Sequence, residues 1–136
     1  MRKVLLLAVA AAVVYYGGGN HAVTSALHAA HVPYVAAGGN EGLANRMAAA
    51  RGWGPAQQNC LDDLWDHESG FRADAQNPSS TAYGIPQFLD ATWGAYGPKT
   101  SDPALQIKYG LEYIHDRYGT PCAAWNFEMS HTPNWY

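Results

Sequence analysis

The sequence predicts a mainly helical domain, and three kinds of observation support this fold class. Apolar side chains recur every three or four residues in two stretches, one around Leu61 and one around Leu111. Proline stands at the expected first position of two helices, after Asp102 and again near the C-terminus. Gly70 and Gly119 follow the apolar stretches, where the end of a helix favours glycine.

The N-terminal part differs in composition from the rest of the chain. Residues 1–19 begin with Arg2-Lys3 and continue with an uncharged apolar run from Val4 to Val14, as is typical of a secretory signal peptide. The run is shorter than the about 20 residues of a membrane span, but no clear Ala-x-Ala cleavage site follows it, so an uncleaved N-terminal anchor is the alternative. Residues 20–39 lack a steady period and are expected to form a linker. One domain then covers residues 40–136.

Two helices are expected at the start of this domain. The first begins at Asn40, a residue type that caps helices, and stops before Gly52. The second follows the turn at residues 52–55 and ends before Gly70. It carries an apolar stripe of Cys60, Leu61, Leu64 and Trp65.

Loops are expected after the second helix. Residues 71–82 are rich in turn-forming residues and predict a loop or a minimal hairpin. Between Gly84 and Tyr96 we expect short helical turns around Phe88 and Trp93.

Two further helices complete the predicted domain. Asp102-Pro103 is a strong helix start, and the helix should run to Gly119. Its apolar stripe consists of Ile107, Leu111, Ile114 and Tyr118. Thr120-Pro121 repeats the start signal, so residues 122–126 are expected to form one more short helix.

The charge and composition indicate how the domain would hold a ligand. The formal net charge is −3, which makes nucleic acid an unexpected partner. The chain has five Trp, nine Tyr and three Phe, and most of them follow Trp53. Such a domain would hold even an anionic polymer by shape, hydrogen bonds and aromatic stacking.

The sequence lacks the patterns of several common catalytic and metal sites. His67-Glu68 has no second histidine four residues on, so the zinc-protease helix motif fails. His28 and His31 have no cysteine or acidic residue near them in the sequence, as a metal site would need. There is no G-x-S-x-G elbow and no phosphate-binding glycine loop. We therefore expect neither a metal nor a cofactor.

The two cysteines, Cys60 and Cys122, are expected to form a disulfide if the chain is exported. The alternative is a pair of free buried thiols, which a cytoplasmic location would favour. With the cysteines paired, no thiol nucleophile remains.

Glu68 continues the apolar stripe of the second helix at its last turn. Burial disfavours a carboxylate, and so does the negative end of a helix dipole, so the pKa of Glu68 should be raised. Such a proton donor is what glycoside cleavage needs to protonate the leaving oxygen. From the residues alone, a structural role is equally open, in which Glu68 caps the helix or pairs with Arg72.

Three short motifs in order decide between these interpretations: Glu68-Ser69, Gly84-Ile85-Pro86-Gln87 and Ala124-Trp125-Asn126. With the two cysteines, they resemble the soluble lytic transglycosylase domain in its actinobacterial, aggregation-promoting-factor-like form. They are more distantly similar to the resuscitation-promoting factors. The resemblance runs from about Asn40 to Tyr136.

This resemblance implies a small lysozyme-like helical domain that cleaves peptidoglycan between N-acetylmuramic acid and N-acetylglucosamine. Glu68 would act first as acid and then as base, with the acetamido group of the substrate assisting and the muramic 6-hydroxyl closing an anhydro ring. The residues implied in substrate binding are Ser69, Tyr83, Gly84, Gln87, Trp125 and Asn126. Trp125 has an alternative role, which is to fill the core beside Cys122.

Some departures and alternatives remain. Asp90 stands where many relatives have proline, which leaves the product chemistry open, but neither Asp74 nor Asp90 is expected to be an essential second carboxylate. The alternatives are a non-catalytic wall-binding or adhesion module and a hydrolytic muramidase with a second carboxylate. We expect a monomer that is secreted or associated with the cell wall. It would be targeted by the domain itself, by an N-terminal membrane anchor, or by a larger particle such as a phage virion.

Overall fold

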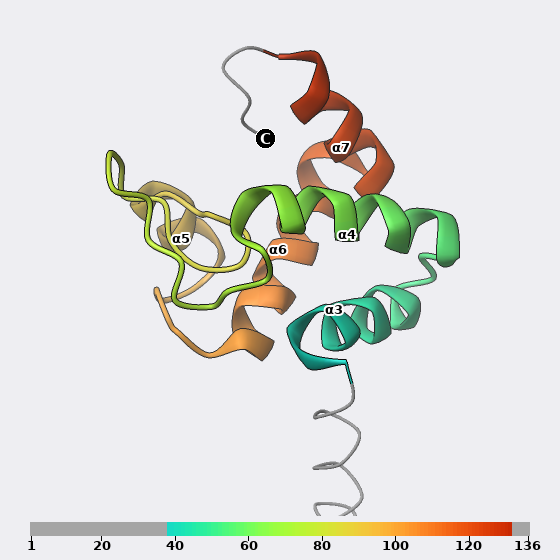
Figure 1. Cartoon of the computed structure of the whole chain (residues 1–136), viewed down its shortest axis with the longest axis horizontal. Helices are drawn as coiled ribbons and strands as arrows, with labels where there is room; N and C mark the ends of the chain where they lie inside the picture. The colour runs from blue at the N-terminus through green and yellow to red at the C-terminus, as the bar shows by residue number, and fades with distance from the viewer. Residues whose placement is uncertain (1–37, 132–136) are drawn as a thin grey trace, which may run out of the picture. The chain divides into compact units, whose positions relative to one another are not determined.

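The computed structural model describes residues 38–131, and these residues form five helices joined by loops (Figure 1). The helices are α3 (Gly39–Ala50), α4 (Pro55–Ser69), α5 (Asp90–Tyr96), α6 (Pro103–Tyr118) and α7 (Pro121–Ser130). Within the described residues there is no strand, but isolated antiparallel bridges join Gln76 to Tyr83 and Tyr83 to Phe88. The mainly helical class is confirmed, and the loop after α4 is a minimal hairpin.

The predicted signal peptide or anchor, almost all of the linker, and the closing Trp135-Tyr136 lie outside the described residues. Among the helices within residues 38–131, none combines the length and the apolar character that a membrane crossing requires.

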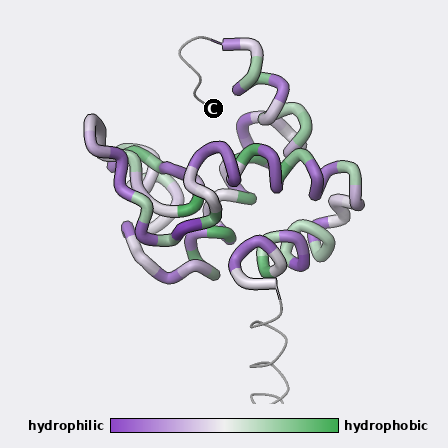
Figure 2. The backbone as a smooth tube through the Cα atoms, in the orientation of Figure 1, coloured by the Kyte–Doolittle hydropathy of each residue, from purple (hydrophilic) through white to green (hydrophobic). Residues whose placement is uncertain are grey.

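Helix α4 lies between α7 and α3 and packs against both (Figure 1). It begins with Pro55 after an extended Gly54, and it ends where Gly70 adopts a left-handed conformation with φ of 59°. Its hydrophilic and hydrophobic residues alternate with a helical period (Figure 2). Leu61, Leu64 and Trp65 are fully buried, so the predicted apolar stripe faces the core.

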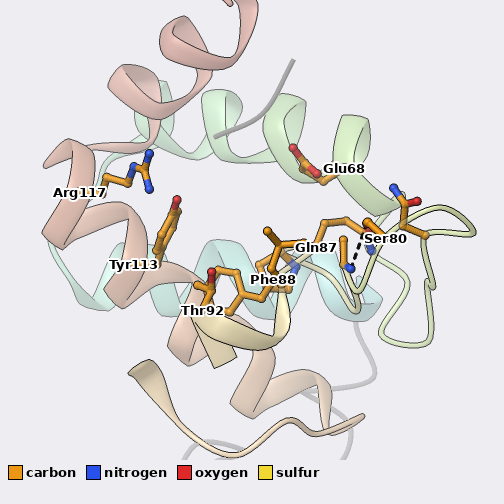
Figure 3. A pocket seen from close by; sticks show the side chains of 11 residues that line it. Glu68, Ser80, Gln87, Phe88, Thr92, Tyr113 and Arg117 are labelled. Carbon is orange, nitrogen blue, oxygen red and sulfur yellow. Dashed lines mark hydrogen bonds between the residues drawn. The ribbon is translucent and has the colours of Figure 1, made fainter. Parts of the chain in front are cut away.

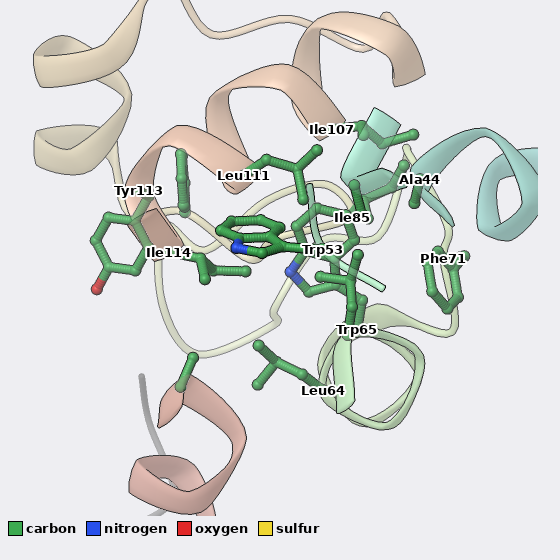
Figure 4. Close-up of a cluster of buried hydrophobic side chains, with 14 of the residues drawn as sticks. Ala44, Trp53, Leu64, Trp65, Phe71, Ile85, Ile107, Leu111, Tyr113 and Ile114 are labelled. Atoms are coloured by element: carbon green, nitrogen blue, oxygen red, sulfur yellow. The ribbon is translucent and has the colours of Figure 1, made fainter. Parts of the chain in front are cut away.

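The core gathers where α3, α4 and α6 meet, around Trp53 and Trp65 (Figure 4). Helix α6 contributes the fully buried Ile107, Leu111 and Ile114 to this cluster. Gly110 lets α6 approach, because a Cβ atom there would lie 2.6 Å from the indole ring of Trp65. The close contact between α6 and α4 therefore depends on a glycine in a helix interior, despite its unfavourable propensity.

Gln106 lies on α6, and its fully buried side chain forms hydrogen bonds to the backbone of the loops. Its amide nitrogen donates to the carbonyl oxygens of Ala73 at 2.8 Å and Thr100 at 2.7 Å. Its amide oxygen accepts from the backbone N–H of Ile85 at 2.8 Å. One side chain thus satisfies three backbone groups and holds three loop segments together.

The start of α3 differs from the expected position. The helix begins at Gly39 after a left-handed Gly38, so Asn40 is not the N-cap. Instead the amide of Asn40 donates to the carbonyl oxygen of Phe71 at 2.9 Å. The side chain of Asn40 therefore makes a tertiary contact with the segment after α4 and does not cap α3.

Two other expected boundaries also need correction. Phe88 is not in a helical turn but pairs with Tyr83, and helix α5 starts only at Asp90. Helix α7 extends to Ser130 rather than ending at Asn126. The reason is that Pro121, Ala124 and Glu128 form its buried face. A glutamate at that last position gives no apolar signal in the sequence.

Cys60 on α4 and Cys122 on α7 form the predicted disulfide, with an S–S distance of 2.08 Å. The two cysteines are 62 residues apart in the sequence, so the bridge closes most of the domain into one loop. The backbone N–H of Cys122 also donates to the side-chain oxygen of Gln57 at 2.9 Å.

We predict that Cys122→Ser lowers the melting temperature by about 10 °C or more, because a bridge over such a loop stabilises a protein by about 4 kcal/mol. Thermal unfolding followed by circular dichroism, with and without reductant, measures this. Reductant should lower the melting temperature of the wild type to that of the variant. An unchanged midpoint would show that the bridge adds no stability.

Candidate active site

Glu68 projects from the last turn of α4 into a groove of about 390 Å³ (Figure 3). The opposite wall of the groove comes from the loop between α4 and α5, and Tyr113 and Arg117 of α6 close one end. The lining residues are Glu68, Asn77, Ser80, Ala82, Pro86, Gln87, Phe88, Leu89, Thr92, Tyr113 and Arg117. Glu68 is the one carboxyl group among them.

The carboxyl of Glu68 is half-buried, and its surroundings favour the protonated form. Burial, first, and the neighbouring carboxyl of Glu128, second, raise the pKa of Glu68 from 4.5 to about 8. Removal from water makes the anion unfavourable, and a second negative charge close by adds to this cost. Glu68 therefore has the protonation state of a general acid at neutral pH.

Glu128, on α7, is a functional candidate that the sequence analysis did not identify. Its side chain is only 1% exposed, and its Oε1 lies 3.3 Å from Nδ1 of His67. Its other carboxylate oxygen, Oε2, is buried without a hydrogen-bond partner among the described residues. Burial raises the pKa of Glu128, and the interaction with His67 opposes that rise.

His67, Glu68 and Glu128 each place one nitrogen or oxygen atom within 4.8 Å of the others. These atom types also occur in metal sites. A cation bound to the oxygens of Glu68 would require the carboxylate form. The same carboxyl could then not donate a proton, so the two roles exclude each other.

Gln87 is the predicted substrate-binding residue that does line the groove. Its amide nitrogen donates to the carbonyl oxygens of Ala75 and Gly84, at 3.0 and 2.9 Å. No described residue donates to its amide oxygen, which can accept a hydrogen bond from a ligand. The backbone of Gln87 is left-handed, with φ of 50°, a conformation that non-glycine residues adopt at a cost.

Ser69 lies next to Glu68 but faces away from the groove. It is 6% exposed, and its hydroxyl donates to the carbonyl oxygen of Ile85 at 2.8 Å. Through this contact Ser69 joins α4 to the loop that carries Gln87, because the residue after Glu68 points towards the core. Its role in substrate binding stays a prediction.

Gly84 and Tyr83 are not among the residues that line the groove. Gly84 has φ of 82°, and a Cβ atom there would lie 2.6 Å from the side-chain amide of Gln106. The backbone of Tyr83 forms antiparallel β-bridges with Gln76 and Phe88, and Nζ of Lys99 lies 5.2 Å from the centre of the Tyr83 ring. Both residues therefore shape the loop and position Gln87.

Trp125 and Asn126 lie on α7 and are not among the lining residues. The half-buried ring of Trp125 meets the ring of His67 edge to face, with centroids 5.9 Å apart. Asn126 is exposed. Trp125 packs against the residue that holds Glu128, so it supports the carboxyl pair from outside the groove.

The structural alternative for Glu68 can be compared with these contacts. Arg72 donates through Nε to the carbonyl oxygen of Ser69 at 3.0 Å. No ion pair between Glu68 and Arg72 occurs within residues 38–131. Asp74 and Asp90 are exposed and do not line the groove, and Asp90 pairs with Lys99 at 2.9 Å.

We predict that Glu68→Gln stabilises the protein at pH 8.5 and that the gain shrinks towards pH 5. Because the folded-state pKa of Glu68 is raised to about 8, ionisation costs folding free energy as the pH rises through the window from 4.5 to 8. The variant cannot ionise at this position. Urea unfolding at both pH values measures the difference, with exposed Asp63→Asn as control. If the free energies of unfolding of the variant and the wild type differ by the same amount at both pH values, the raised pKa of Glu68 is contradicted.

The comparisons with known proteins place this geometry in a family. Neither curated proteins nor solved structures gave a match to the chain. The family model described as the transglycosylase SLT domain matches residues 48–130, which include Glu68, the whole groove and Glu128. The closer likeness to aggregation-promoting-factor-like domains stays a prediction. Since the match covers more than half of the sequence, the chain belongs to the transglycosylase SLT domain family, within the lysozyme-like superfamily.

Proposed function

We propose that this domain cleaves the glycan strand of peptidoglycan between N-acetylmuramic acid and N-acetylglucosamine without water and leaves an anhydro-muramic end. Membership of the SLT family indicates peptidoglycan cleavage of the lytic transglycosylase type. The single observation that carries the finer proposal is Glu68, a carboxyl with a pKa of about 8 that faces a groove.

In the proposed reaction, Glu68 donates its proton to the glycosidic oxygen as the bond to the muramic carbon breaks. The acetamido oxygen of the same sugar attacks this carbon and holds it as a cyclic intermediate. Glu68, now a carboxylate, takes the proton of the muramic 6-hydroxyl while that oxygen displaces the acetamido group. Glu68 thus regains the proton that it donated in the first step and ends the cycle protonated.

The location of the other carboxyl groups favours this route over a hydrolase with a second carboxylate. Glu128 is close to Glu68, but it is 1% exposed and does not line the groove. A nucleophile or a base for water must reach the sugar carbon, which a side chain buried behind Glu68 cannot do. Asp74 and Asp90 do not line the groove either.

The rest of the groove suits a sugar substrate. Asn77, Ser80, Gln87 and Thr92 are uncharged hydrogen-bonding groups, which match hydroxyl and acetamido groups. Leu89, which is exposed, adds apolar surface against which the carbon face of a sugar ring can pack. The disulfide is consistent with an exported, wall-associated protein.

We predict that Glu68→Gln lowers the rate of wall lysis by about a hundredfold or more while the protein stays folded, because the amide keeps the shape and has no acidic proton. Turbidity loss of purified cell walls measures lysis. Asp90→Asn is the matched control, because Asp90 is an exposed acid that does not line the groove, and this variant should keep most of the activity.

Mass spectrometry of the released muropeptides tests the chemistry in the same samples. Products that lack one water relative to reducing ends are expected. Reducing ends from the wild type would indicate a hydrolase. Normal lysis by folded Glu68→Gln would refute the catalytic proposal and favour a wall-binding or adhesion module.

A further inference from the structure

We propose that Glu128 is a positioning residue for this reaction: held by His67, it keeps the catalytic proton on Glu68 and thereby sets the upper pH limit of activity. The inference rests on the proposed function, in which Glu68 must be protonated to start the reaction. It concerns a residue on α7 that does not touch the groove.

The geometry brings two carboxyl groups together where both cannot ionise at low cost. A carboxyl oxygen of Glu128 lies within 4.8 Å of one of Glu68, and the side chain of Glu128 is 1% exposed. Water therefore screens the interaction between them poorly. The titrations of two carboxyl groups at such a distance are coupled, because the negative charge of one raises the affinity of the other for its proton.

His67 decides which of the two carries the charge. Its Nδ1 lies 3.3 Å from Oε1 of Glu128, and no salt bridge or hydrogen bond joins it to Glu68 among the described residues. A ring N–H that donates to Glu128 stabilises the carboxylate form of Glu128. The proton then stays on Glu68, the partner that faces the substrate. The edge contact with Trp125 restrains the His67 ring in this position.

After burial, Glu128 is the one charged group that shifts the pKa of Glu68 within the described residues. From α6, Tyr113 and Arg117 line the groove, and the guanidinium of Arg117 lies 5.6 Å from the ring centres of Tyr113 and of Tyr118. The loop between α4 and α5, together with Thr92, contributes only uncharged side chains to the lining. Oε2 of Glu128 is buried and has no hydrogen-bond partner among the described residues, a cost to folding that this role explains.

The test compares the pH dependence of kcat/KM for wall lysis between pH 5 and 9.5. In Glu128→Gln the charge is lost and the shape is kept, so the basic limb should move down by roughly one pH unit. Activity at pH 6 should stay within about threefold of the wild type, whereas at pH 8.5 it should fall about tenfold. Glu128→Asp keeps the charge, so its basic limb should lie close to that of the wild type. Asp63→Asn, which removes an exposed charge from α4, should leave the limb in place.

Several outcomes would overturn the inference. If folded Glu128→Gln keeps the basic limb of kcat/KM at the wild-type pH, Glu128 does not influence the proton of Glu68. An equal loss at every pH would indicate a structural role or direct participation in catalysis. A shift that disappears when EDTA is added would indicate a bound cation instead. If Glu68→Gln is inactive while Glu128→Gln is unshifted, this inference alone fails. If Glu68→Gln is active, the proposed function fails.

A second measurement applies if Glu128→Gln does not fold. Carbon-13 NMR of the Glu128 carboxyl in the wild type should show a step near pH 8, where Glu68 ionises. The step should vanish in Glu68→Gln, because coupled groups report each other's titration. A wild-type signal without this step would contradict the inference.

Discussion

The packing of α4 against α7 is the interaction on which the rest of the structure depends. The Cys60–Cys122 bridge covalently joins the two helices, and His67 and Glu128 connect them near the C-terminal end of α4. The apolar stripe of α4 faces the core, so the helix can neither rotate nor slide without exposing Trp65. This fixed helix holds the carboxyl of Glu68 at the boundary between core and groove.

The groove is assembled at some cost to folding, and the core and the buried hydrogen bonds offset it. Phe71 and Gln87 have left-handed backbones, with φ of 56° and 50°. The buried Oε2 of Glu128 has no partner among the described residues. Against these, Gln106 satisfies three backbone groups of the surrounding loops. Local backbone strain that is supported by rigid neighbouring structure is typical of preorganised sites.

The features that sequence analysis predicted are those with local signals. The position of Glu68 followed from the period of Leu61, Leu64 and Trp65, and the start of α6 followed from Asp102-Pro103, where Asp102 accepts from two backbone N–H groups. The cysteine pair followed from their number and the expected export. The mainly helical class followed from the same periodicity.

The features that the sequence could not reveal depend on contacts between distant segments. Glu128 lies 60 residues after Glu68 in the numbering, and nothing near it in the sequence indicates that it is buried beside another carboxyl. The Glu68-Ser69 motif predicted that Ser69 binds the sugar. The direction of its side chain, however, depends on where the carbonyl group of Ile85 lies. Trp125 likewise packs on His67 rather than lining the groove, which no periodic pattern specifies.

The central claim is that the fold keeps a proton on Glu68 at neutral pH. Carbon-13 NMR titration of the Glu68 carboxyl in the wild-type protein tests it most directly, with the signal identified by its loss in Glu68→Gln. Half-protonation of this carboxyl is expected near pH 8. Half-protonation near pH 4.5, the value of an ordinary glutamate, would contradict it.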